Sequence, residues 1–249
     1  MDSSLSLAIA ARQPLFDDAH NSAFRLFNGF AEGDSTLSLD IYARTLVIHN
    51  YADDPTKNQF VIDSLFNVLP DLLVWLRAGI VKQRNGLTQE DKRGKLLFGD
   101  SPDTKISEHG VWYALDLTMN RDASFYLDTS LLRKWLIENM RGRSVLNTFA
   151  YTGSFGVAAL AGGATRVVQI DRNRKFLDLA KRSYTLNGFQ INTKDFVAQD
   201  FFPAVSRFKH SKQFFDCVIL DPHSFRPRPK AKWIRKQKAR GSSTKSARW

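Results

Sequence analysis

The second half of the chain alternates short apolar runs with segments of helical period. The apolar runs are Ser144–Asn147, Arg166–Ile170, Phe196–Ala198 and Phe215–Leu220. An alanine-rich helical segment that ends at Gly162-Gly163 follows the first run, and a helical pattern over Asn173–Leu186 follows the second. Continuous apolar strands that alternate with helices are typical of parallel sheets with helices on both faces. The pattern therefore predicts a doubly wound α/β domain.

The first 105 residues follow a different pattern. Ala23–Ile48 contains β-branched and aromatic residues in partial alternation, which predicts strands. Ile62–Leu73 has a helical pattern that we expect to break at Pro70, and Val74–Gln83 again favours a strand. We expect a small α+β domain over residues 1–105, with a boundary near residue 105 in a polar stretch rich in glycine.

Two extended segments and a helix lead from this boundary into the α/β domain. Val111–Leu117 and Ser124–Leu127 favour extended structure. Ser130–Met140 places its leucines, its tryptophan and its methionine on one helical face. We therefore assign residues 106–225 to the second domain and residues 226–249 to a tail.

Charge separates the tail from the rest of the chain. The 249 residues carry a formal net charge of +11, but Pro222–Trp249 holds ten Lys or Arg and no Asp or Glu. Residues 1–221 therefore hold 26 basic and 25 acidic residues. The tail suits nonspecific binding to RNA phosphates. The net charge of the whole chain is weak evidence about the function of residues 1–221, because these residues are nearly neutral.

Composition excludes several classes of protein. Hydrophobic residues make up 43% of the chain, enough to bury a core, which excludes global disorder. No apolar run approaches the roughly 18–20 residues of a membrane span, and no Cys/His spacing indicates a metal site. The single cysteine, Cys217, allows no internal disulfide, which favours a reducing, cytoplasmic setting. It lies in an apolar strand, which favours a buried, inert thiol over a nucleophile.

Four ends of the predicted strands carry residues suited to a ligand, and ligands of such sheets bind at these ends. A turn with Gly153 follows the first strand, where glycine allows a close approach of the backbone to a ligand. Asp171 follows the second strand, where a carboxylate can accept hydrogen bonds from both hydroxyls of a ribose. Asp200, beside two phenylalanines, suits an adenine, and Asp221-Pro222 ends the fourth strand. Together the four predict a nucleoside pocket.

The turn lacks the glycine pattern of dinucleotide-binding folds, and the chain contains no phosphate-binding loop of the G-x-x-x-x-G-K-[ST] type. A nucleoside without phosphates, S-adenosylmethionine (SAM), therefore fits better than a nicotinamide dinucleotide. A nicotinamide oxidoreductase is a third interpretation, which the turn sequence disfavours.

At this point the chain resembles the class I SAM-dependent methyltransferases of large-subunit (23S) ribosomal RNA, in the branch with an FLD-type motif before the SAM fold. The segments that carry the resemblance are FYLDTSLLRKWL (125–136), VLNTFAYTGSFGVAALAGGA (145–164), the Asp171 strand, LNG (186–188) and FDCVILDP (215–222). Residues 24–51 are similar to the small domain that precedes the catalytic domain in part of this group. The resemblance covers the chain from about Leu15 to Pro222.

The resemblance implies a Rossmann-like fold, SAM as cofactor, large-subunit ribosomal RNA as partner, and roles for individual residues. Asp171 would hold the ribose of SAM, Asp200 would face the adenine, and Asp221 with Pro222 would face the target base. The residues expected to hold the methionine part or to close over the cofactor are Asn147, Phe149, Ala150, Tyr151, Gly153, Phe125 and Asp128. Whether cytosine C5 or a guanine nitrogen is methylated stays open.

The chain departs from the family pattern in two places. His223 stands where the family has a second proline, and Ser130 stands where the motif usually carries arginine. Beyond Phe225 the apolar pattern ends, although the resemblance implies a sheet of strand order 3-2-1-4-5-7-6, with three more strands after this point. Loss of one base in the codon after Pro222 would explain this, because the codons allowed in the shifted frame permit Asp-Pro-Pro-Phe and then a helical pattern. We therefore expect an incomplete sheet with an exposed edge and impaired activity. A non-catalytic RNA-binding protein is the alternative.

Overall fold

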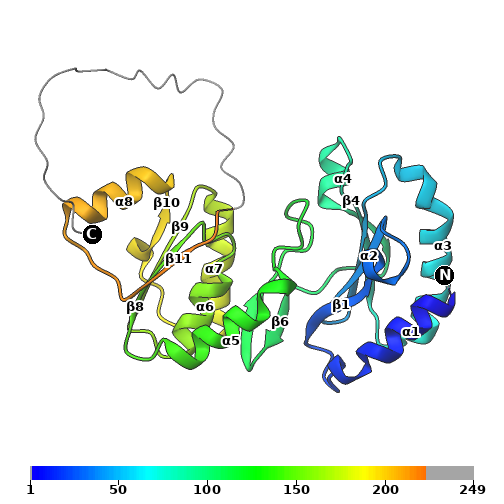
Figure 1. Ribbon diagram of the computed structural model, residues 1–249, viewed down its shortest axis with the longest axis horizontal. Helices are drawn as coiled ribbons and strands as arrows, with labels where there is room; N and C mark the ends of the chain where they lie inside the picture. The colour runs from blue at the N-terminus through cyan, green and yellow to red at the C-terminus, as the bar shows by residue number, and fades with distance from the viewer. Residues whose placement is uncertain (1, 223–249) are drawn as a thin grey trace, which may run out of the picture.

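Two sheets of different type, joined by a short hairpin, form the part of the chain that this computed structural model describes, residues 2–222 (Figure 1). The N-terminal sheet has the order β1-β2-β3-β4-β5, and only β3 and β4 are parallel. Its strands are β1 (Ala23–Asn28), β2 (Leu37–Tyr42), β3 (Thr45–Asn50), β4 (Ala78–Gln83) and β5 (Lys95–Phe98). Its helices are α1 (Asp2–Arg12), α2 (Gly29–Glu32), α3 (Gln59–Leu72) and α4 (Gln89–Arg93), with single 3-10 turns at Gln13–Leu15 and Pro55–Asn58.

Both faces of this sheet are covered, which explains why every residue of β2 and β3 is buried. On one face, Leu39 and Ile48 pack against Ile62 and Leu69 of α3. On the other face, the sheet packs against the segments that lead into the C-terminal sheet, in a second cluster that contains Val47. The N-terminal sheet is therefore fixed directly beside the second half of the chain.

The hairpin consists of β6 (Lys105–Glu108) and β7 (Val111–Ala114). His109 and Gly110 form its two-residue turn, with φ of 52° and 77°. Two left-handed residues in succession match the turn that suits the right-handed twist of strands.

The C-terminal sheet has four parallel strands in the order β10-β9-β8-β11. Its elements are α5 (Ser130–Asn139), β8 (Ser144–Thr148), α6 (Ser154–Ala161), β9 (Arg166–Asp171), α7 (Arg174–Leu186), β10 (Phe196–Ala198), α8 (Phe201–His210) and β11 (Cys217–Leu220), with 3-10 turns at Leu127–Thr129 and Thr193–Asp195. Val145 of β8 packs with α5 and α6, whereas its neighbour Leu146 packs with Phe208 of α8. Helices on both faces and parallel pairing confirm the predicted α/β fold.

Two local predictions from the sequence differ from the structure. Helix α3 continues past Pro70 to Leu72, because a proline two residues before the end of a helix disturbs only its last turn. Ser124–Leu127 is not a strand, since this segment leads into a 3-10 turn. The frameshift hypothesis, His223 and the basic tail concern residues 223–249, which lie outside the described residues.

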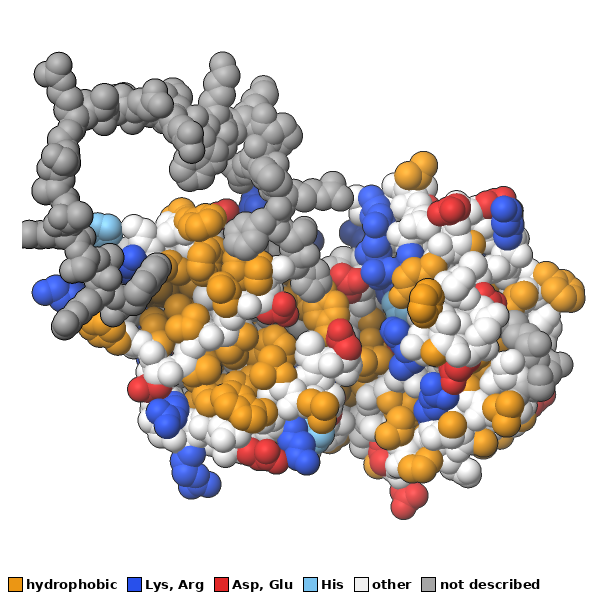
Figure 2. Space-filling model, viewed as in Figure 1, with side chains coloured by type: hydrophobic (Ala, Val, Ile, Leu, Met, Phe, Trp, Pro, Cys, Tyr) orange, Lys and Arg blue, Asp and Glu red, His pale blue; other side chains and the backbone are white. Residues whose placement is uncertain are grey.

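Strand β11 pairs with β8 alone among the described residues. Val218 and Leu220 are 56% and 59% exposed, and hydrophobic side chains gather on the surface of the half that holds this sheet (Figure 2). The expected apolar edge is therefore present in the described part of the chain. None of the helices within residues 2–222 is long and apolar enough to cross a membrane.

Candidate functional site

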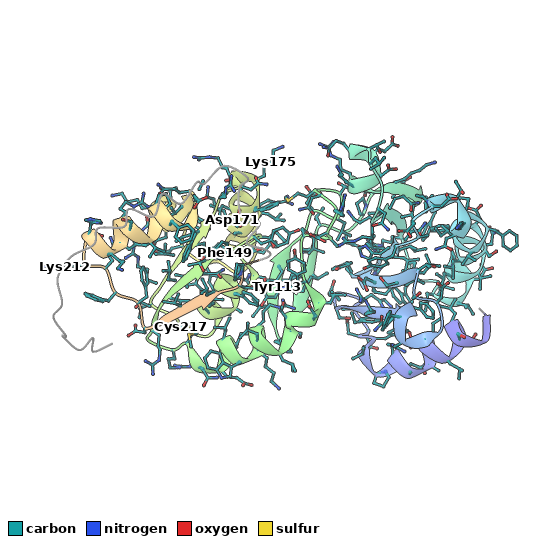
Figure 3. All side chains as sticks on the ribbon, turned by 45° about the horizontal axis from the view of Figure 1, so that its top comes forward. Tyr113, Phe149, Asp171, Lys175, Lys212 and Cys217 are labelled. Atoms are coloured by element: carbon teal, nitrogen blue, oxygen red, sulfur yellow. The ribbon has the colours of Figure 1, made fainter. Side chains whose placement is uncertain are left out.

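A cavity of about 210 Å³ lies at the carboxyl ends of β8, β9 and β11. Its lining residues are Asn120, Asp122, Tyr126, Phe149, Tyr151, Asp171, Phe176 and Asp221. Four of these, Phe149, Tyr151, Asp171 and Asp221, are among the residues predicted from the sequence. Figure 3 shows Phe149 and Asp171 together at one end of the sheet and Cys217 at the other end.

The loop between β8 and α6 shapes one wall of this cavity. Phe149, Tyr151 and Gly153 all have left-handed backbones, with φ of 53°, 51° and 77°. The amide of Ala150 donates to the carbonyl of Ile170 at 2.8 Å, which ties the loop to the end of β9. Left-handed conformations are uncommon for residues other than glycine and concentrate at functional sites. The loop is therefore held in a conformation that its sequence alone does not favour.

The carboxylate of Asp171 is fixed by two backbone amides. Its Oδ2 accepts from the amide of Tyr151 at 2.9 Å, and its Oδ1 accepts from the amide of Asn173 at 2.8 Å. Burial raises the pKa of Asp171, because it disfavours the charged form, and these hydrogen bonds oppose the shift. Since a carboxylate offers about four acceptor positions, Asp171 retains acceptors for a ligand.

Aromatic rings form much of the remaining wall. The rings of Phe149 and Phe201 stack with centroids 5.0 Å apart. The ring of Tyr151 meets Phe176 edge-on at 4.6 Å and Tyr126 at 5.1 Å. The cavity therefore offers flat apolar surfaces beside the Asp171 carboxylate.

The segment before α5 closes the cavity from the side of the N-terminal sheet. The buried ammonium of Lys82, in β4, donates to the carbonyl of Asn120 at 2.7 Å. The hydroxyl of Tyr151 donates to Oδ1 of Asn120 at 3.3 Å, and the hydroxyl of Thr152 donates to the carbonyl of Ser124 at 2.6 Å. These contacts hold one wall of the cavity between the two sheets.

Sequence reasoning missed Asn120, Asp122 and Phe176, whereas Tyr126 lies inside the segment from Phe125 to Asp128 that was expected to close over the cofactor. Asn120 and Asp122 lie in a polar stretch that has neither helical nor strand period. The position of Phe176, one turn into the helix that follows Asp171, was the signal that could have identified it.

The charge of the lining is one-sided. Asp122, Asp171 and Asp221 contribute three carboxylates, of which Asp122 pairs with Arg84 outside the lining, and no described lining residue is Lys, Arg or His. Such a lining attracts a cationic ligand and repels phosphate groups. Aromatic faces also attract cations.

Several predicted residues support the cavity without lining it. Asn147 is fully buried and donates through Nδ2 to Gln169 at 3.0 Å. Ala150 is buried. Gly153 caps α6, and a Cβ atom there would lie 2.5 Å from the Cβ of Ala180. The glycine is therefore required for packing between α6 and α7, beyond any contact with a ligand.

Other predicted residues lie farther along the same edge or in a different cavity. Asp200 caps α8 by accepting from the amide of Phe202 at 3.3 Å. Phe125 and Asp128 line a separate cavity beside the N-terminal sheet. Pro222, the last described residue, directly follows Asp221.

Cys217 is half-buried at the start of β11, so it lies at the end of the strand away from the cavity. Burial raises the pKa of its thiol. Both observations agree with the sequence-based interpretation of an inert cysteine.

The family model described as S-adenosylmethionine-dependent methyltransferase matches residues 80–241, which is more than half of the chain. The ribosomal RNA large subunit methyltransferase I of Alteromonas mediterranea is 31% identical over 89% of this chain and 56% of its own length. The protein of the same name from Aeromonas salmonicida is 30% identical over the same shares. The chain thus spans little more than half the length of these curated relatives.

Solved structures show the same fold. A protein of Streptococcus mutans that is assigned as a SAM-dependent methyltransferase matches with a TM-score of 0.78 and 22% identity, over 88% of this chain and 57% of that one. A methyltransferase structure in complex with SAH matches with a TM-score of 0.77 and 21% identity, over 88% and 56%. The fold, the cavity at the strand ends and the family match lead to one conclusion. This chain belongs to the S-adenosylmethionine-dependent methyltransferase family.

Proposed function

We propose that the cavity between Asp171 and Asp221 holds SAM, and that the protein methylates a base of large-subunit ribosomal RNA. The observation that carries this proposal is the lining of three carboxylates and four aromatic rings, without a cation among the described residues. SAM carries a sulfonium charge and no phosphate, so both features favour it. The pyrophosphate of a nicotinamide dinucleotide would meet the carboxylates of Asp171 and Asp221, which argues against the oxidoreductase alternative.

The described residues suggest how SAM would be held. Asp171, fixed by two amides, would accept from the ribose hydroxyls. The ring of Phe149, which stacks on Phe201, would lie against the adenine, with Asp200 beside it at the start of α8. The loop that contains Ala150 would lie along the methionine part, with Asn147 and Gly153 fixing the shape of the loop.

Methyl transfer from SAM to a base would require little from the protein beyond the positioning of the two reactants. When bound, SAM supplies a methyl group on a positively charged sulfur. Asp221 and Pro222, at the end of β11 beside the cavity, would align the target base with that methyl group, and the aromatic wall would exclude water. A base inside an RNA helix must leave its stack to reach this depth.

The names of the relatives support large-subunit ribosomal RNA as the substrate. The single cysteine, which allows no internal disulfide, supports the cytoplasm as the place of the reaction. We further propose a division into a small domain over residues 1–105, on the RNA side, and a SAM-binding domain over residues 106–225. The gap between the end of β5 at Phe98 and the start of β6 at Lys105 supports this boundary.

Transfer of a labelled methyl group from SAM to ribosomal RNA tests the proposal. The substrate is protein-free large-subunit RNA from cells that lack the modification, and small-subunit RNA is the control. We expect label in the large-subunit RNA alone, and much less label with an Asp171→Asn variant when SAM is kept below the concentration that saturates this variant. Binding of SAM without transfer to either RNA would favour the non-catalytic RNA-binding alternative.

A further inference from the structure

A second cavity, of about 510 Å³, lies between the N-terminal sheet and the segment that leads into α5. One side of this cavity is lined by residues of β1, β2 and β3 and of the turn that follows β4. The other side is lined by residues 122–130. Asp122 and Tyr126 line this cavity and also the candidate SAM cavity, so the two cavities share a wall. Its volume falls within the roughly 300–1,000 Å³ that is usual for ligand pockets.

Most charges in this second cavity are already neutralised by partners. Nε of Arg25 lies 2.8 Å from Oδ1 of Asp40, and Nη1 of Arg84 lies 2.8 Å from Oδ1 of Asp122. Asp128 differs, because within residues 2–222 its carboxylate has neither an ion pair nor a hydrogen bond. Because Arg25 and Arg84 are paired, the lining does not attract a phosphate, and the carboxylate of Asp128 can accept hydrogen bonds from a ligand.

His49 adds a second unused acceptor. Its side chain is 6% exposed, and Nε2 lies 3.3 Å from Oδ2 of Asp40. Its Nδ1 is buried and has no hydrogen-bond partner among the described residues. When Nε2 carries the proton toward Asp40, Nδ1 is an acceptor that lacks a donor. A buried polar atom without a partner costs about 1–3 kcal/mol, and an N–H group of a ligand in the cavity that reaches Nδ1 would remove this cost.

Tyr51 supplies a flat surface at the same cavity. Its side chain is exposed, and the guanidinium of Arg84 lies 5.7 Å from the centre of its ring. Aromatic rings and guanidinium planes are the surfaces on which proteins stack unpaired bases of RNA.

We propose that this cavity binds one unpaired nucleobase of the substrate RNA, next to the base that is methylated. The proposal rests on the proposed function, since it places a second nucleotide beside the SAM cavity. The ring stacks on Tyr51, and amino or imino groups of the base donate to His49 and Asp128. Both sheets contribute to the subsite, so the N-terminal sheet takes part in choosing the RNA.

Base-dependent RNA binding by the full 249-residue chain tests this. Fluorescence anisotropy is measured with a labelled single-stranded RNA of mixed sequence, and with an abasic RNA of the same length that retains every phosphate. We expect Tyr51→Ala to weaken binding of the normal RNA about 5- to 150-fold, the range for loss of one stacked base. Tyr51→Phe, which keeps the ring, should bind within about twofold of the unchanged protein.

The abasic RNA and a second variant provide the controls. Tyr51→Ala should leave binding of the abasic RNA unchanged, because phosphate contacts with the basic residues 226–249 do not depend on bases. Phe60→Ala removes an aromatic ring that is 82% exposed on α3, away from the cavity, and should change neither affinity. Equal affinities of Tyr51→Ala and the unchanged protein for the normal RNA would overturn the proposal, as would equal losses for both RNAs.

Calorimetric titration with SAM separates this proposal from the proposed function. Tyr51→Ala should bind SAM like the unchanged protein, because Tyr51 does not line the SAM cavity. If neither the unchanged protein nor Tyr51→Ala binds SAM, the proposed function fails. If SAM binds and the effect of Tyr51 on RNA is absent, only the nucleobase subsite fails.

Discussion

Replacing Asp171 by asparagine removes the negative charge at the centre of the candidate site while keeping the shape of the side chain. A carboxylate held by two backbone amides can accept from both ribose hydroxyls of SAM, whereas the asparagine amide keeps one oxygen and gains two N–H donors. Loss of one hydrogen bond to a charged group costs about 1.5–3 kcal/mol. Since each 1.4 kcal/mol is about tenfold, we expect SAM to bind about 10- to 150-fold more weakly.

The same change also affects folding, and the two effects can be measured separately. The side-chain NH2 group of the asparagine takes the place of one carboxylate oxygen, so the backbone amide of either Tyr151 or Asn173 loses its acceptor. A buried amide without an acceptor costs about 1–3 kcal/mol. Removal of a carboxylate whose charge is disfavoured by burial offsets part of this cost. For a chain of this size the remaining loss lowers the melting temperature by roughly 2–12 °C, so the variant should stay folded at 25 °C.

Isothermal titration calorimetry with SAM gives the affinity, and circular dichroism verifies the fold. Asp178→Asn is the matched control, because this carboxylate is 56% exposed on α7 and pairs with Lys181. The control should bind SAM like the unchanged protein. A folded Asp171→Asn variant that binds SAM within twofold of the unchanged protein would refute the assigned role of Asp171.

Three further predictions concern stability and association. Gly153→Ala should destabilise the fold by about 2–4 kcal/mol, because its Cβ would lie 2.5 Å from that of Ala180 and its φ is 77°; an unchanged melting temperature would contradict the packing. Burial lowers the pKa of Lys82 to about 8 from 10.5, so the unfolded chain binds more protons between these values and stability rises with pH. The free energy of unfolding of the unchanged protein, measured in urea, should therefore rise by about 2 kcal/mol from pH 8 to pH 10, and that of Lys82→Met should lack this rise. Parallel pH profiles of the two proteins would argue against a buried ammonium. Val218→Lys, on the exposed edge of β11, should reduce self-association in sedimentation velocity; equal association would show that the edge is not the contact.

The sequence predicted the parallel sheet because local signals determine its strands, whereas the order of the strands came only from the family resemblance. The strands are continuous apolar runs, and each ligand-facing acid directly follows one of them, as Asp171 and Asp221 do. The order β10-β9-β8-β11 agrees with the start of the order implied by the family resemblance.

The opposite wall of the cavity could not be predicted in this way. Asn120 and Tyr126 reach the cavity through tertiary contacts, above all the hydrogen bond from Lys82 in a different sheet. No periodicity in the sequence records such a contact. Phe125 and Asp128, expected from the resemblance to close over the cofactor, line the adjacent cavity, because the direction of a short 3-10 turn decides which cavity they face.

A crystal structure of the chain with S-adenosylhomocysteine, the stable product of methyl transfer, tests the central claim most directly. The account predicts the ligand in the cavity at the ends of β8 and β9, with ribose hydroxyls about 2.5–3.0 Å from the carboxylate of Asp171 and the sulfur toward Asp221. Ligand bound elsewhere, or absent from that cavity at saturating concentration, would contradict it.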